Sequence, residues 1–445
     1  MIIRFGVANH RSIREYQELS LVATKLKDDE SGLLIAGNEP LHQEIPPDNA
    51  LRVVPVVALY GANASGKSTV LHALSTLVQM IVTSHESRER RWFQPFLLDD
   101  ESRKGPAKYD IDFVIDATRF HYGVETCSER IRSEWLYSYN LAAKRQTRTV
   151  LFHRDSEAAE EFYFGKTLKG ENRQISRLVR KDSLFISAAA QNSHPQLTGV
   201  YDFFRNKFTS RLHSGTEAML ADHLVAYFGS SETRRANALS FLRAADVGVS
   251  GMDFSKIPVG ERVKTFSKGL EKLLGDYLSE IGQEEEFSLA RDERSDVKLV
   301  HSGGDGKTYS LEISAESAGT TSLLSLLGPI FERLAEGGVI IIDELNSTLH
   351  PLVSRKLIGL FSDPETNPKG AQAIFTTHDT NILGGGSLRR DQIWFAEKDR
   401  EGATHLYAMS DIKVRASDNL EAGYLSGRFG AVPFYGVEML ALQEA

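Results

Sequence analysis

The chain has 445 residues, of which 41% are hydrophobic and 25% are charged, so it is long enough for two or three packed units. Its formal net charge of -8 disfavours a surface that coats nucleic acid broadly, although a local basic groove is compatible with it. Cys127 is the single cysteine, which excludes an internal disulfide and a cysteine-rich zinc site and fits a reducing cytoplasm.

The N-terminal region predicts a strand, a turn and a second strand over residues 1–25, and then a polar loop over residues 26–50. Polar and apolar residues alternate at the start of the sequence, where a secretory signal would carry a continuous apolar core. The apolar run Val53–Tyr60 is far too short to span a bilayer and predicts a buried parallel strand, and Ser68–Thr83 predicts an amphipathic helix. We therefore expect a cytoplasmic protein without a membrane segment.

The next part of the chain predicts an antiparallel lobe, with β-rich segments at Tyr109–Asp116, Arg119–Glu125 and Ser133–Tyr139. Polar helical patterns follow at Ile175–Arg180, Val200–Phe208, Glu217–Phe228, Ser231–Ala244 and Gly260–Ile281. Strands are expected again at Ser295–Val300 and Thr308–Ile313. Helices and strands then alternate at Gly319–Glu336, Gly338–Asp343, Leu352–Phe361 and Ala371–Thr377. The order predicts an α/β protein whose two β-rich parts are separated by a helical insertion.

A phosphate-binding loop lies between the first long strand and the first long helix. Its residues are Gly61, Ala62, Asn63, Ala64, Ser65, Gly66, Lys67, Ser68 and Thr69. Glycines let backbone amides turn toward phosphates, and the helix N-terminus adds partial positive charge. Lys67 is positioned to reach the β- and γ-phosphates of ATP, and the Ser68 hydroxyl to bind Mg²⁺. The alternative is a glycine-rich turn that only joins a strand to a helix.

Gly338–Glu344 reads GVIIIDE, a buried strand that ends in two acids. Asp343 is expected to hold the magnesium together with Ser68, and Glu344 to polarise the attacking water as a general base. The alternative is a buried strand that ends in solvated carboxylates. The long chain separation between Lys67 and Asp343 exceeds what a compact kinase or GTPase needs, so it favours an ATPase head split by an insertion.

Two further motifs flank this strand. Ser317, Gly319 and Thr320 stand at the start of a predicted helix, where backbone amides and a hydroxyl can bind an anion. His378 comes just after a predicted strand, at the sheet edge where α/β proteins bind ligands. The alternatives are an ordinary N-capped helix and a structural or surface histidine.

Together, the sequences GANASGKST, ESAGT, IIIDELNSTLHP and FTTHD resemble the ABC-type ATPases of the RecF, SMC and OLD group. The resemblance implies that Ser317, Gly319 and Thr320 form a signature loop that meets the γ-phosphate on an opposing subunit, and that His378 is the switch histidine. NHRSI places Asn9 and Arg11 in a turn whose arginine reaches toward the nucleotide, unless Arg11 is only a solvated charge. His350 occupies the D-loop position, and Gln94 is a candidate Q-loop glutamine that ordinary packing would also explain.

The resemblance implies an α/β, ABC-type P-loop ATPase head of two lobes with an inserted helical domain. Residues 1–149 would form the N-terminal part of the head with Walker A and the antiparallel lobe. Residues 150–285 would form the helical insertion for sensing, partner binding or dimerisation. Residues 286–445 would form the C-terminal part with the signature, Walker B, the D-loop and the switch histidine.

A closer likeness, which covers most of the chain, is to the group's bacterial antiphage-defence ATPases, such as RloA, AbiLi, the Septu subunit PtuA and the PARIS subunit AriA. It rests on segments that include WFQPFLLD, DSLFISAAAQN, LRRDQIWFAEKD and NLEAGYLSGRFGAVPF, the last of which has no assigned role. The resemblance implies a homodimer or higher homo-oligomer joined through ATP-sandwiched heads. It also implies a separate effector protein, often a Toprim-type nuclease, and a phage protein as a trigger.

No nuclease centre is expected in this chain. The residues after His378 are too few for a Toprim domain beside the rest of the head, and the single cysteine excludes a cysteine-rich HNH zinc site. Basic clusters at Arg88–Arg91 and Lys144–Arg148 would line a nucleic-acid groove or form a solvated face. The alternatives are a DNA-repair ATPase like RecF or RecN that binds DNA directly, and a P-loop kinase or GTPase. The acidic balance and the lack of long heptads disfavour the first, and the signature and His378 disfavour the second.

Overall fold

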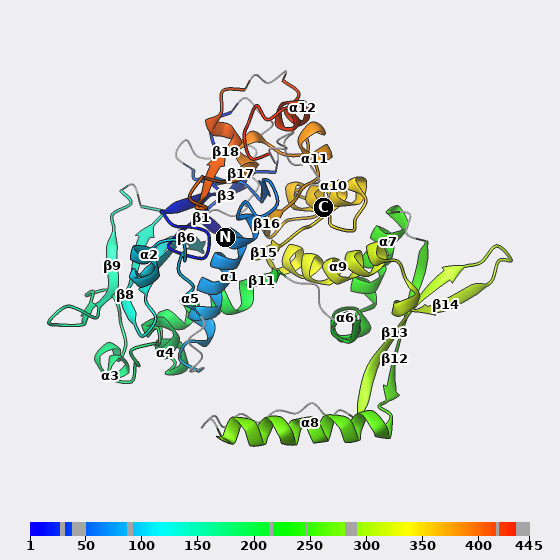
Figure 1. The fold of residues 1–445 in the computed structure, drawn as a ribbon, viewed down its shortest axis with the longest axis horizontal. Helices are drawn as coiled ribbons and strands as arrows, with labels where there is room; N and C mark the ends of the chain where they lie inside the picture. The colour runs from blue at the N-terminus through cyan, green and yellow to red at the C-terminus, as the bar shows by residue number, and fades with distance from the viewer. Residues whose placement is uncertain are drawn as a thin grey trace, which may run out of the picture. The chain divides into compact units, whose positions relative to one another are not determined.

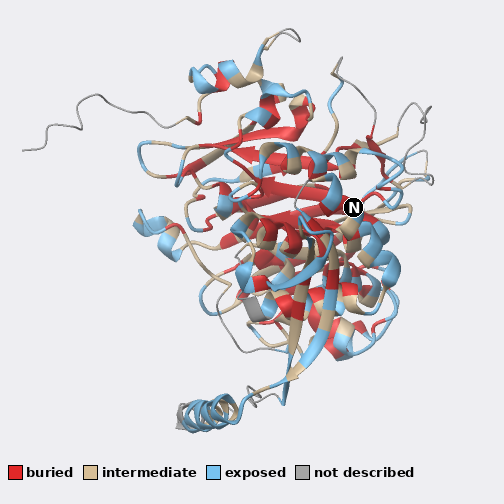
Figure 2. Cartoon of the chain, turned by 90° about the vertical axis from the view of Figure 1, so that its right-hand side faces the viewer, coloured by how far each residue is buried: buried red, intermediate tan, exposed pale blue. Residues whose placement is uncertain are grey.

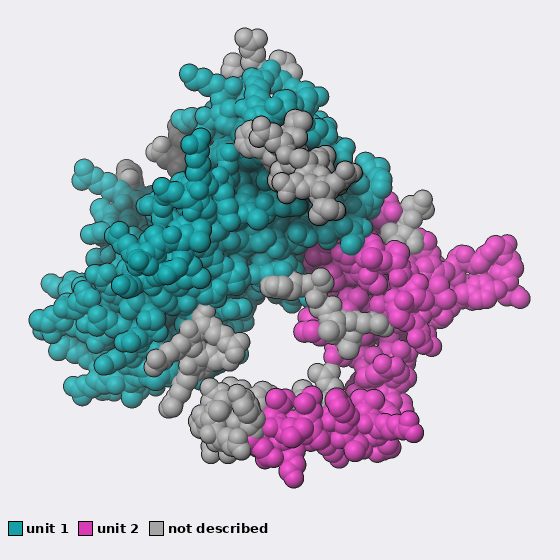
Figure 3. Space-filling model, in the orientation of Figure 1, with its two compact units in different colours: residues 1–213, 332–445 teal, residues 214–331 magenta. Residues whose placement is uncertain are grey.

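The computed structural model describes residues 1–26, 32–37, 50–86, 92–143, 145–212, 217–245, 248–280, 292–414 and 418–432. It divides into two compact units, coloured separately in Figure 3. Unit 1 combines residues 1–213 with residues 332–445, and unit 2 is residues 214–331. The basic cluster Arg88–Arg91, most of the predicted loop 26–50 and the last part of the C-terminal motif lie outside the described residues.

Unit 1 is built on a six-stranded sheet of order β11-β15-β16-β5-β17-β18, in which only β18 is antiparallel to its neighbour. The strands are β5 (Val56–Tyr60), β11 (Phe208–Arg211), β15 (Val339–Ile342), β16 (Gln372–Thr376), β17 (Ile393–Lys398) and β18 (Thr404–Ala408). Every residue of β5, β15 and β16 is buried, which explains their continuous apolar runs. Figure 2 shows these central strands in the colour of buried residues.

The second sheet of unit 1 has seven strands in the order β10-β9-β8-β7-β6-β1-β2, and all its pairings are antiparallel. The strands are β1 (Ile2–Ala8), β2 (Gln17–Ser20), β6 (Ala107–Ile115), β7 (Thr118–Thr126), β8 (Ile131–Asn140), β9 (Thr149–Asp155) and β10 (Phe162–Phe164). A small pair joins β3 (Leu34–Ile35) to β4 (Arg52–Val53). The predicted antiparallel lobe is therefore present, and it is wider than the sequence suggested.

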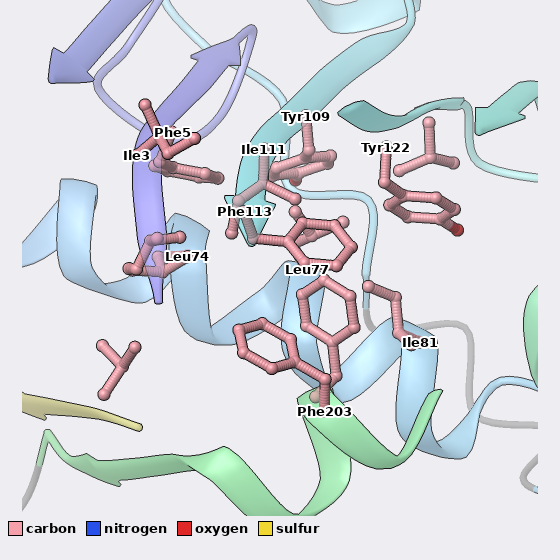
Figure 4. Close-up of a cluster of buried hydrophobic side chains, with 14 of the residues drawn as sticks. Ile3, Phe5, Leu74, Leu77, Ile81, Tyr109, Ile111, Phe113, Tyr122 and Phe203 are labelled. Atoms are coloured by element: carbon pink, nitrogen blue, oxygen red, sulfur yellow. The ribbon is translucent and has the colours of Figure 1, made fainter. Parts of the chain in front are cut away.

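Helix α1 (Lys67–Thr83) packs against both sheets. One hydrophobic cluster contains Leu59 of β5, Leu74 and Leu77 of α1, and Phe5 and Phe113 of the antiparallel sheet. Figure 4 shows the α1 side chains directed at the aromatic residues of this sheet. The remaining helices of unit 1 are α2 (Asp100–Lys104), α3 (Asn172–Ser176), α4 (Phe185–Gln191), α5 (Leu197–Lys207), α10 (Pro351–Ser362), α11 (Asn381–Gly384) and α12 (Leu420–Leu425), with short 3-10 turns η3 (Arg390–Gln392) and η4 (Met409–Asp411). The phosphate-binding loop is thus anchored at both ends by buried elements.

Unit 2 combines helices with a three-stranded antiparallel sheet, β12-β13-β14. Its strands are β12 (Val249–Pro258), β13 (Glu293–Ser302) and β14 (Thr308–Glu312). Its helices are α6 (Glu217–Leu224), the π-helix η1 (Val225–Gly229), α7 (Glu232–Ala244), α8 (Glu261–Glu280), the short turn η2 (Ile313–Ala315) and the first part of α9 (Ala318–Glu336). Helix α8 connects β12 to β13, and Figure 2 shows it largely in the colour of exposed residues.

The boundaries of unit 2 differ from the predicted insertion of residues 150–285. Strand β9 and helices α4 and α5 belong to unit 1, because Phe152, Phe185 and Phe204 are buried in its hydrophobic cluster. The insertion is also not purely helical. Even so, the order of the strands around β5 confirms the predicted class, an α/β, two-lobed ABC-type P-loop ATPase head interrupted by an inserted unit. Among the described residues, no helix is both long and apolar enough to cross a membrane.

Candidate nucleotide site

The phosphate-binding loop, Gly61–Gly66, runs from the end of β5 to the start of α1. Gly61 and Gly66 have φ angles of +154° and +105°, which L side chains rarely adopt. A Cβ atom on Gly61 would collide with the carbonyl oxygen of Ala396 in β17, and one on Gly66 would collide with the side chain of Thr404. The glycines are therefore required both by the backbone turn and by close contact with the neighbouring strands.

Lys67 is buried, with a relative exposure of 6%, and its ammonium donates hydrogen bonds to the carbonyl oxygens of Gly61 and Ala62, each at 2.9 Å. Burial lowers the pKa of Lys67 to about 8, against the opposing attraction of Asp343 and Glu344. Carbonyl oxygens thus hold the lysine at the loop, where phosphate oxygens are the stronger acceptors for an ammonium. The residue fits a nucleotide phosphate.

The Walker B acid lies directly beside the loop helix. The Ser68 hydroxyl donates to Asp343 Oδ1 at 2.9 Å, and the Thr376 hydroxyl donates to the same oxygen at 2.6 Å. One hydroxyl and one carboxylate at the N-terminus of a helix are the hard oxygen ligands that Mg²⁺ prefers beside nucleotide phosphates. Ser68 and Asp343 therefore fit the predicted metal role, and Thr376 is a second contact that the sequence motifs did not indicate.

Glu344 stands at the same edge of the sheet. Its φ angle is +53°, an uncommon value for a residue with a side chain, and its amide donates to the Thr376 hydroxyl at 2.7 Å. This turn leaves the Glu344 side chain exposed, two residues after the end of the buried strand β15. An exposed carboxylate next to Ser68 and Asp343, the residues suited to bind Mg²⁺, can accept a proton from water.

His378 follows β16 and is exposed, whereas the residues on either side of it are buried. Partial desolvation and the positive charge of Lys67 lower the pKa of His378, although Glu344 and Asp343 oppose the shift. The imidazole is therefore neutral at pH 7 and can donate one hydrogen bond without adding a charge. The electrostatic influence of Lys67, Asp343 and Glu344 on His378 indicates that these four side chains share one site.

The N-terminal turn holds Arg11 through a chain of side chains. Arg11 has a φ angle of +50°, and its Nε donates to Gln94 Oε1 at 2.6 Å. Its Nη2 donates to His72 Nε2 at 2.6 Å, and His72 Nδ1 lies 3.2 Å from His10 Nε2. Because Arg11 only donates, His72 Nδ1 carries the hydrogen and His10 Nδ1 donates to the Tyr109 hydroxyl at 2.8 Å. Burial lowers the pKa of His10 to about 3, so the His10 imidazole is neutral.

Asn9 supports this turn from inside the protein. It is 7% exposed, and its amide nitrogen donates to the carbonyls of Ser102 and Gly105 at 2.8 and 3.0 Å. Its Oδ1 accepts the amide of Phe96 at 2.9 Å. These backbone groups occupy the Asn9 side chain, so its influence on a nucleotide would pass through Arg11. Gln94 contacts Arg11, which assigns it to the Arg11 turn.

Thr404, the first residue of β18, joins the turn to the phosphate-binding loop. Its hydroxyl donates to the Ser65 carbonyl and lies within 2.9 Å of the Ser12 hydroxyl, which in turn donates to Thr69 at 3.1 Å. The Thr404 amide also donates to the Ser12 carbonyl at 2.7 Å. No sequence motif marks Thr404. A polar residue at a strand end, opposite a glycine of the loop, is the only signal that could have indicated it.

The predicted D-loop connects β15 to α10. His350 is exposed and caps α10, because its Nδ1 accepts the amide of Leu352 at 3.2 Å. Asn346 accepts a hydrogen bond from the Thr377 hydroxyl at 2.6 Å, and the Leu345 amide donates to the Thr376 carbonyl at 3.1 Å. The D-loop and the segment before His378 are therefore directly linked within unit 1.

The predicted signature residues belong to unit 2. Ser317 precedes α9, and its hydroxyl accepts the Thr320 amide at 3.1 Å, which is an N-capping contact. Ser317 is exposed, Gly319 is partly exposed and Thr320 is buried. Ser317 is therefore an N-cap, as expected for an ordinary helix start. Ser317 and Gly319 nevertheless remain accessible at the helix N-terminus.

A cluster of Asp110, Asp112 and His121 on the antiparallel sheet has metal-ligand composition. Arg4 pairs with Asp110 at 2.7 Å and with Asp112 at 3.0 Å, and Arg119 also pairs with Asp112. Two arginines neutralise these carboxylates, so the cluster is an ion-pair network that braces β1, β6 and β7.

Comparison with known proteins places this site in a family. A family model described as "AAA domain, putative AbiEii toxin, Type IV TA system" matches residues 56–384. No curated protein matches the chain. Similar solved structures include an SmcHead bound to the C-winged helix domain of ScpA, with 11% identity, a TM-score of 0.42 and coverage of 92% of this chain and 97% of that chain.

Two other SMC heads are similar at the same 11% identity. The SMC head domain from Thermotoga maritima has a TM-score of 0.37, with coverage of 93% of this chain and 99% of that chain. The Smc head with an extended coiled coil, bound to the C-terminal domain of ScpA derived from Pyrococcus furiosus, has a TM-score of 0.36, with coverage of 92% and 96%. The family match covers most of the chain and includes both halves of the site, so this protein belongs to the AAA-domain family described above and is an ATP-binding ATPase.

Proposed function

We propose that this protein hydrolyses ATP with Mg²⁺ in the cytoplasm and serves as the sensor and scaffold subunit of a bacterial antiphage-defence complex. In that role it controls a separate effector, a nuclease of the Toprim class, after a phage protein triggers it. The observation that carries the ATPase part is the Ser68–Asp343–Thr376 arrangement next to Lys67 and Glu344. The description of the matched family, which names a putative toxin of a Type IV TA system, supports the defence part.

The residues divide the work of hydrolysis. Bound ATP with magnesium supplies the γ-phosphate that water attacks. On nucleotide binding, Lys67 would exchange the carbonyls of Gly61 and Ala62 for phosphate oxygens, and Ser68 and Asp343 would hold the metal. Glu344 accepts a proton from the attacking water, and neutral His378 donates a hydrogen bond to the γ-phosphate.

A second copy of the chain completes the site in this proposal. Ser317 and Gly319 are accessible at the N-terminus of α9, where the Ser317 hydroxyl caps the Thr320 amide, and an anion is the ligand that such a helix end favours. The γ-phosphate bound by an opposing head supplies that anion. Two heads would therefore close on ATP as a homodimer, or as part of a higher homo-oligomer.

We also propose that α8 joins two copies independently of ATP. Its described side chains include an exposed apolar stripe at helical spacing: Val263, Phe266, Leu270, Leu273 and Leu274. Phe266 and Leu273 are 70% and 68% exposed. Large apolar side chains that are exposed side by side mark a surface for interaction. The spacing of three and four residues is that of a coiled-coil seam.

The distribution of charge supports a second α8 as the partner helix. The first half of α8 carries three bases, Arg262, Lys264 and Lys268, against one acid, Glu261. The second half carries the acids Glu271 and Asp276 against one base, Lys272. Two antiparallel copies would set each basic half against an acidic half, and a symmetric pair would repeat this contact twice. The apolar stripe supplies the stability, and the charges set the direction, since exposed ion pairs contribute little.

Lys67→Ala tests the ATPase proposal. Loss of the ammonium removes charge-assisted hydrogen bonds to phosphate, so nucleotide affinity should fall about 10- to 100-fold. Isothermal calorimetry with ATP and magnesium measures this, and the exposed-site variant Lys166→Ala is the control. Unchanged affinity in Lys67→Ala would contradict the role of the loop.

Effector control needs a separate experiment. The wild-type protein, expressed from its native operon, should recover a nuclease subunit on affinity purification, and Lys67→Ala should change the amount recovered. Recovery of no partner by either protein would count against the complex. If the purified wild type instead bound DNA in an ATP-dependent and salt-sensitive manner, the alternative of a RecF- or RecN-like repair ATPase would be favoured.

A further inference from the structure

The C-terminal segment of the described chain, residues 418–432, contacts β5, β17 and the residues that follow His378. It comprises α12 and the turns that follow it, and we call it the α12 segment. From the sequence alone, no role was assigned to its motif YLSGRFG. Figure 1 shows α12 beside α11, which begins just after His378 in the chain.

Tyr424 joins the α12 segment to the phosphate-binding loop. Its ring stacks on Phe395 at a centroid distance of 5.7 Å and meets Tyr60 edge-on at 5.9 Å. Tyr60 is the last residue of β5 and directly precedes Gly61. The Tyr424 hydroxyl donates to the Ala431 carbonyl at 3.1 Å, and the nearby Gly61 amide partly offsets the rise in the pKa of Tyr424 that burial causes.

Glu421 joins the α12 segment to the residues that follow His378. The Thr380 hydroxyl donates to Glu421 Oε1 at 2.8 Å, two residues after His378. The Tyr60 hydroxyl donates to the Asp379 carbonyl at 3.1 Å, so Tyr60, which precedes Gly61, directly contacts the residue after His378. A side chain on Gly384 would collide with Glu421, which indicates close packing of α11 on α12.

The α12 segment is held in one conformation by its own contacts. The Asn419 side chain caps α12, and the Tyr407 hydroxyl donates to the Phe429 carbonyl at 2.8 Å. The ring of Phe429 packs directly on Gly423, where a Cβ atom would collide with it. Ala431 is 2% exposed and has a φ angle of +57°, a conformation that a non-glycine residue keeps only when its surroundings impose it.

We propose that the α12 segment is a positioning element of the nucleotide site, in which Tyr424 fixes the first residue of the phosphate-binding loop and Glu421 fixes the segment that carries His378. One helical turn separates the two side chains along α12, so a displacement at Gly61 is passed to Thr380 through a rigid body. Tyr424 and Glu421 are positioning residues that do not touch the nucleotide. The inference rests on the proposed hydrolysis of ATP at this site.

Turnover separates this role from a structural one. Tyr424→Phe keeps the ring and removes the hydroxyl, and Glu421→Ala removes the acceptor of Thr380. Each should lower kcat about tenfold while the Kd for ATP changes less than about threefold, because misplacement of His378 affects the chemical step. Glu421→Gln retains an acceptor oxygen and should restore most of the activity. Exposed-site variants Tyr163→Phe and Glu160→Ala serve as matched controls.

A double-mutant cycle tests the shared element. If both contacts act through α12, Tyr424→Phe and Glu421→Ala combined should lower kcat by less than the product of the single effects. Multiplicative losses, or kcat values like the wild type in both single variants, would overturn the proposal. Losses that follow only the fraction unfolded would also overturn it.

Hydrogen exchange provides a readout that needs no hydrolysis. In a Glu344→Gln background, ATP with magnesium should slow amide exchange at the phosphate-binding loop, at residues 378–381 and in the α12 segment. Adding Tyr424→Phe should preserve protection at the loop and reduce it at residues 378–381. Retained protection at both places would contradict the coupling. A wild type that fails to bind ATP would instead contradict the proposed function.

Discussion

Lys67 is a buried cation beside the exposed side chains of Glu344 and His378. Burial lowers its pKa from 10.5 to about 8, so at pH 9 the ammonium of the free protein is mostly deprotonated. Phosphate oxygens would favour the charged form and raise the pKa again. The effect on folding stability is opposite to that of a lysine whose pKa is raised by an ion pair. Between about pH 8 and 10.5 the unfolded chain binds more protons at Lys67, so raising the pH in this range favours the folded state.

Nucleotide binding should therefore take up protons at alkaline pH. We expect the uptake to approach one proton per site at pH 9. The part that comes from Lys67 should disappear toward pH 7, where Lys67 is already protonated in the free protein. Calorimetric titration in buffers of different ionisation enthalpy measures it. Lys67→Ala is the control and should abolish this component. Equal proton uptake in both proteins would show that another group titrates.

Thr376 gives a second prediction at this scale. It is fully buried, donates to Asp343 and accepts the Glu344 amide, so Thr376→Val removes both contacts without changing the shape of β16. We expect a loss of about 1–3 kcal/mol in the free energy of unfolding and about tenfold in kcat. Denaturant unfolding and steady-state turnover measure the two effects. Thr376→Ser keeps the hydroxyl and should restore turnover; a similarly inactive Ser variant would argue against the hydrogen bonds.

Sequence motifs identified residues whose chemistry is tied to a fixed spacing. Lys67, Ser68 and Asp343 come together as expected. Thr376 and Thr404 were not predicted, because single threonines in strands carry no periodic or spacing signal and their partners are distant in the sequence. Gln94 remains a candidate Q-loop residue, and its contact with Arg11 depends on a turn that local patterns do not determine.

At the scale of elements, α8 offers the most direct test. Leu273→Glu places a charge in the apolar stripe and should convert an ATP-independent dimer to a monomer. Thr265→Glu introduces the same charge on the other face of the helix and should leave the dimer intact. Multi-angle light scattering without nucleotide distinguishes them. A wild type that is monomeric at micromolar concentration would refute pairing through α8.

Helices with a clear apolar period were predicted closely. The expected Gly260–Ile281 compares with α8 at Glu261–Glu280, and Leu352–Phe361 compares with α10 at Pro351–Ser362. Strands β9 and β12 were missed. β9 carries buried and partly exposed residues without strict alternation, and in β12 only Val249 and Met252 are buried, so neither strand shows the pattern that burial on one face imposes.

For the whole molecule, Glu344→Gln should retain ATP binding and stop turnover, which would hold two heads closed. Placing it in a Leu273→Glu background removes the contact proposed for α8. The double variant should be monomeric without nucleotide and dimeric with ATP and magnesium on size-exclusion chromatography. Leu273→Glu alone, which still hydrolyses ATP, is the control. A double variant that stays monomeric with ATP would contradict closure of the heads.

The extent of the units could not be read from composition. Phe152, Phe185 and Phe204 lie in a region of polar helical patterns, yet they are buried in unit 1. The fold class was predicted correctly because it depends on the ordered motifs near β5, β15 and β16. The limits of unit 2 depend on which apolar side chains meet in space, and that is set by long-range packing.

The sheet order has a consequence for how the protein is made. Strand β5 pairs with β16 and β17, whose residues 372–376 and 393–398 are synthesised long after Val56–Tyr60. During translation the very apolar β5 therefore lacks both neighbours until nearly the whole chain has left the ribosome. Parallel pairing over such separations is slow and exposes strand edges. A nascent chain is thus unable to hold ATP, and truncated products should aggregate and not act as partial ATPases.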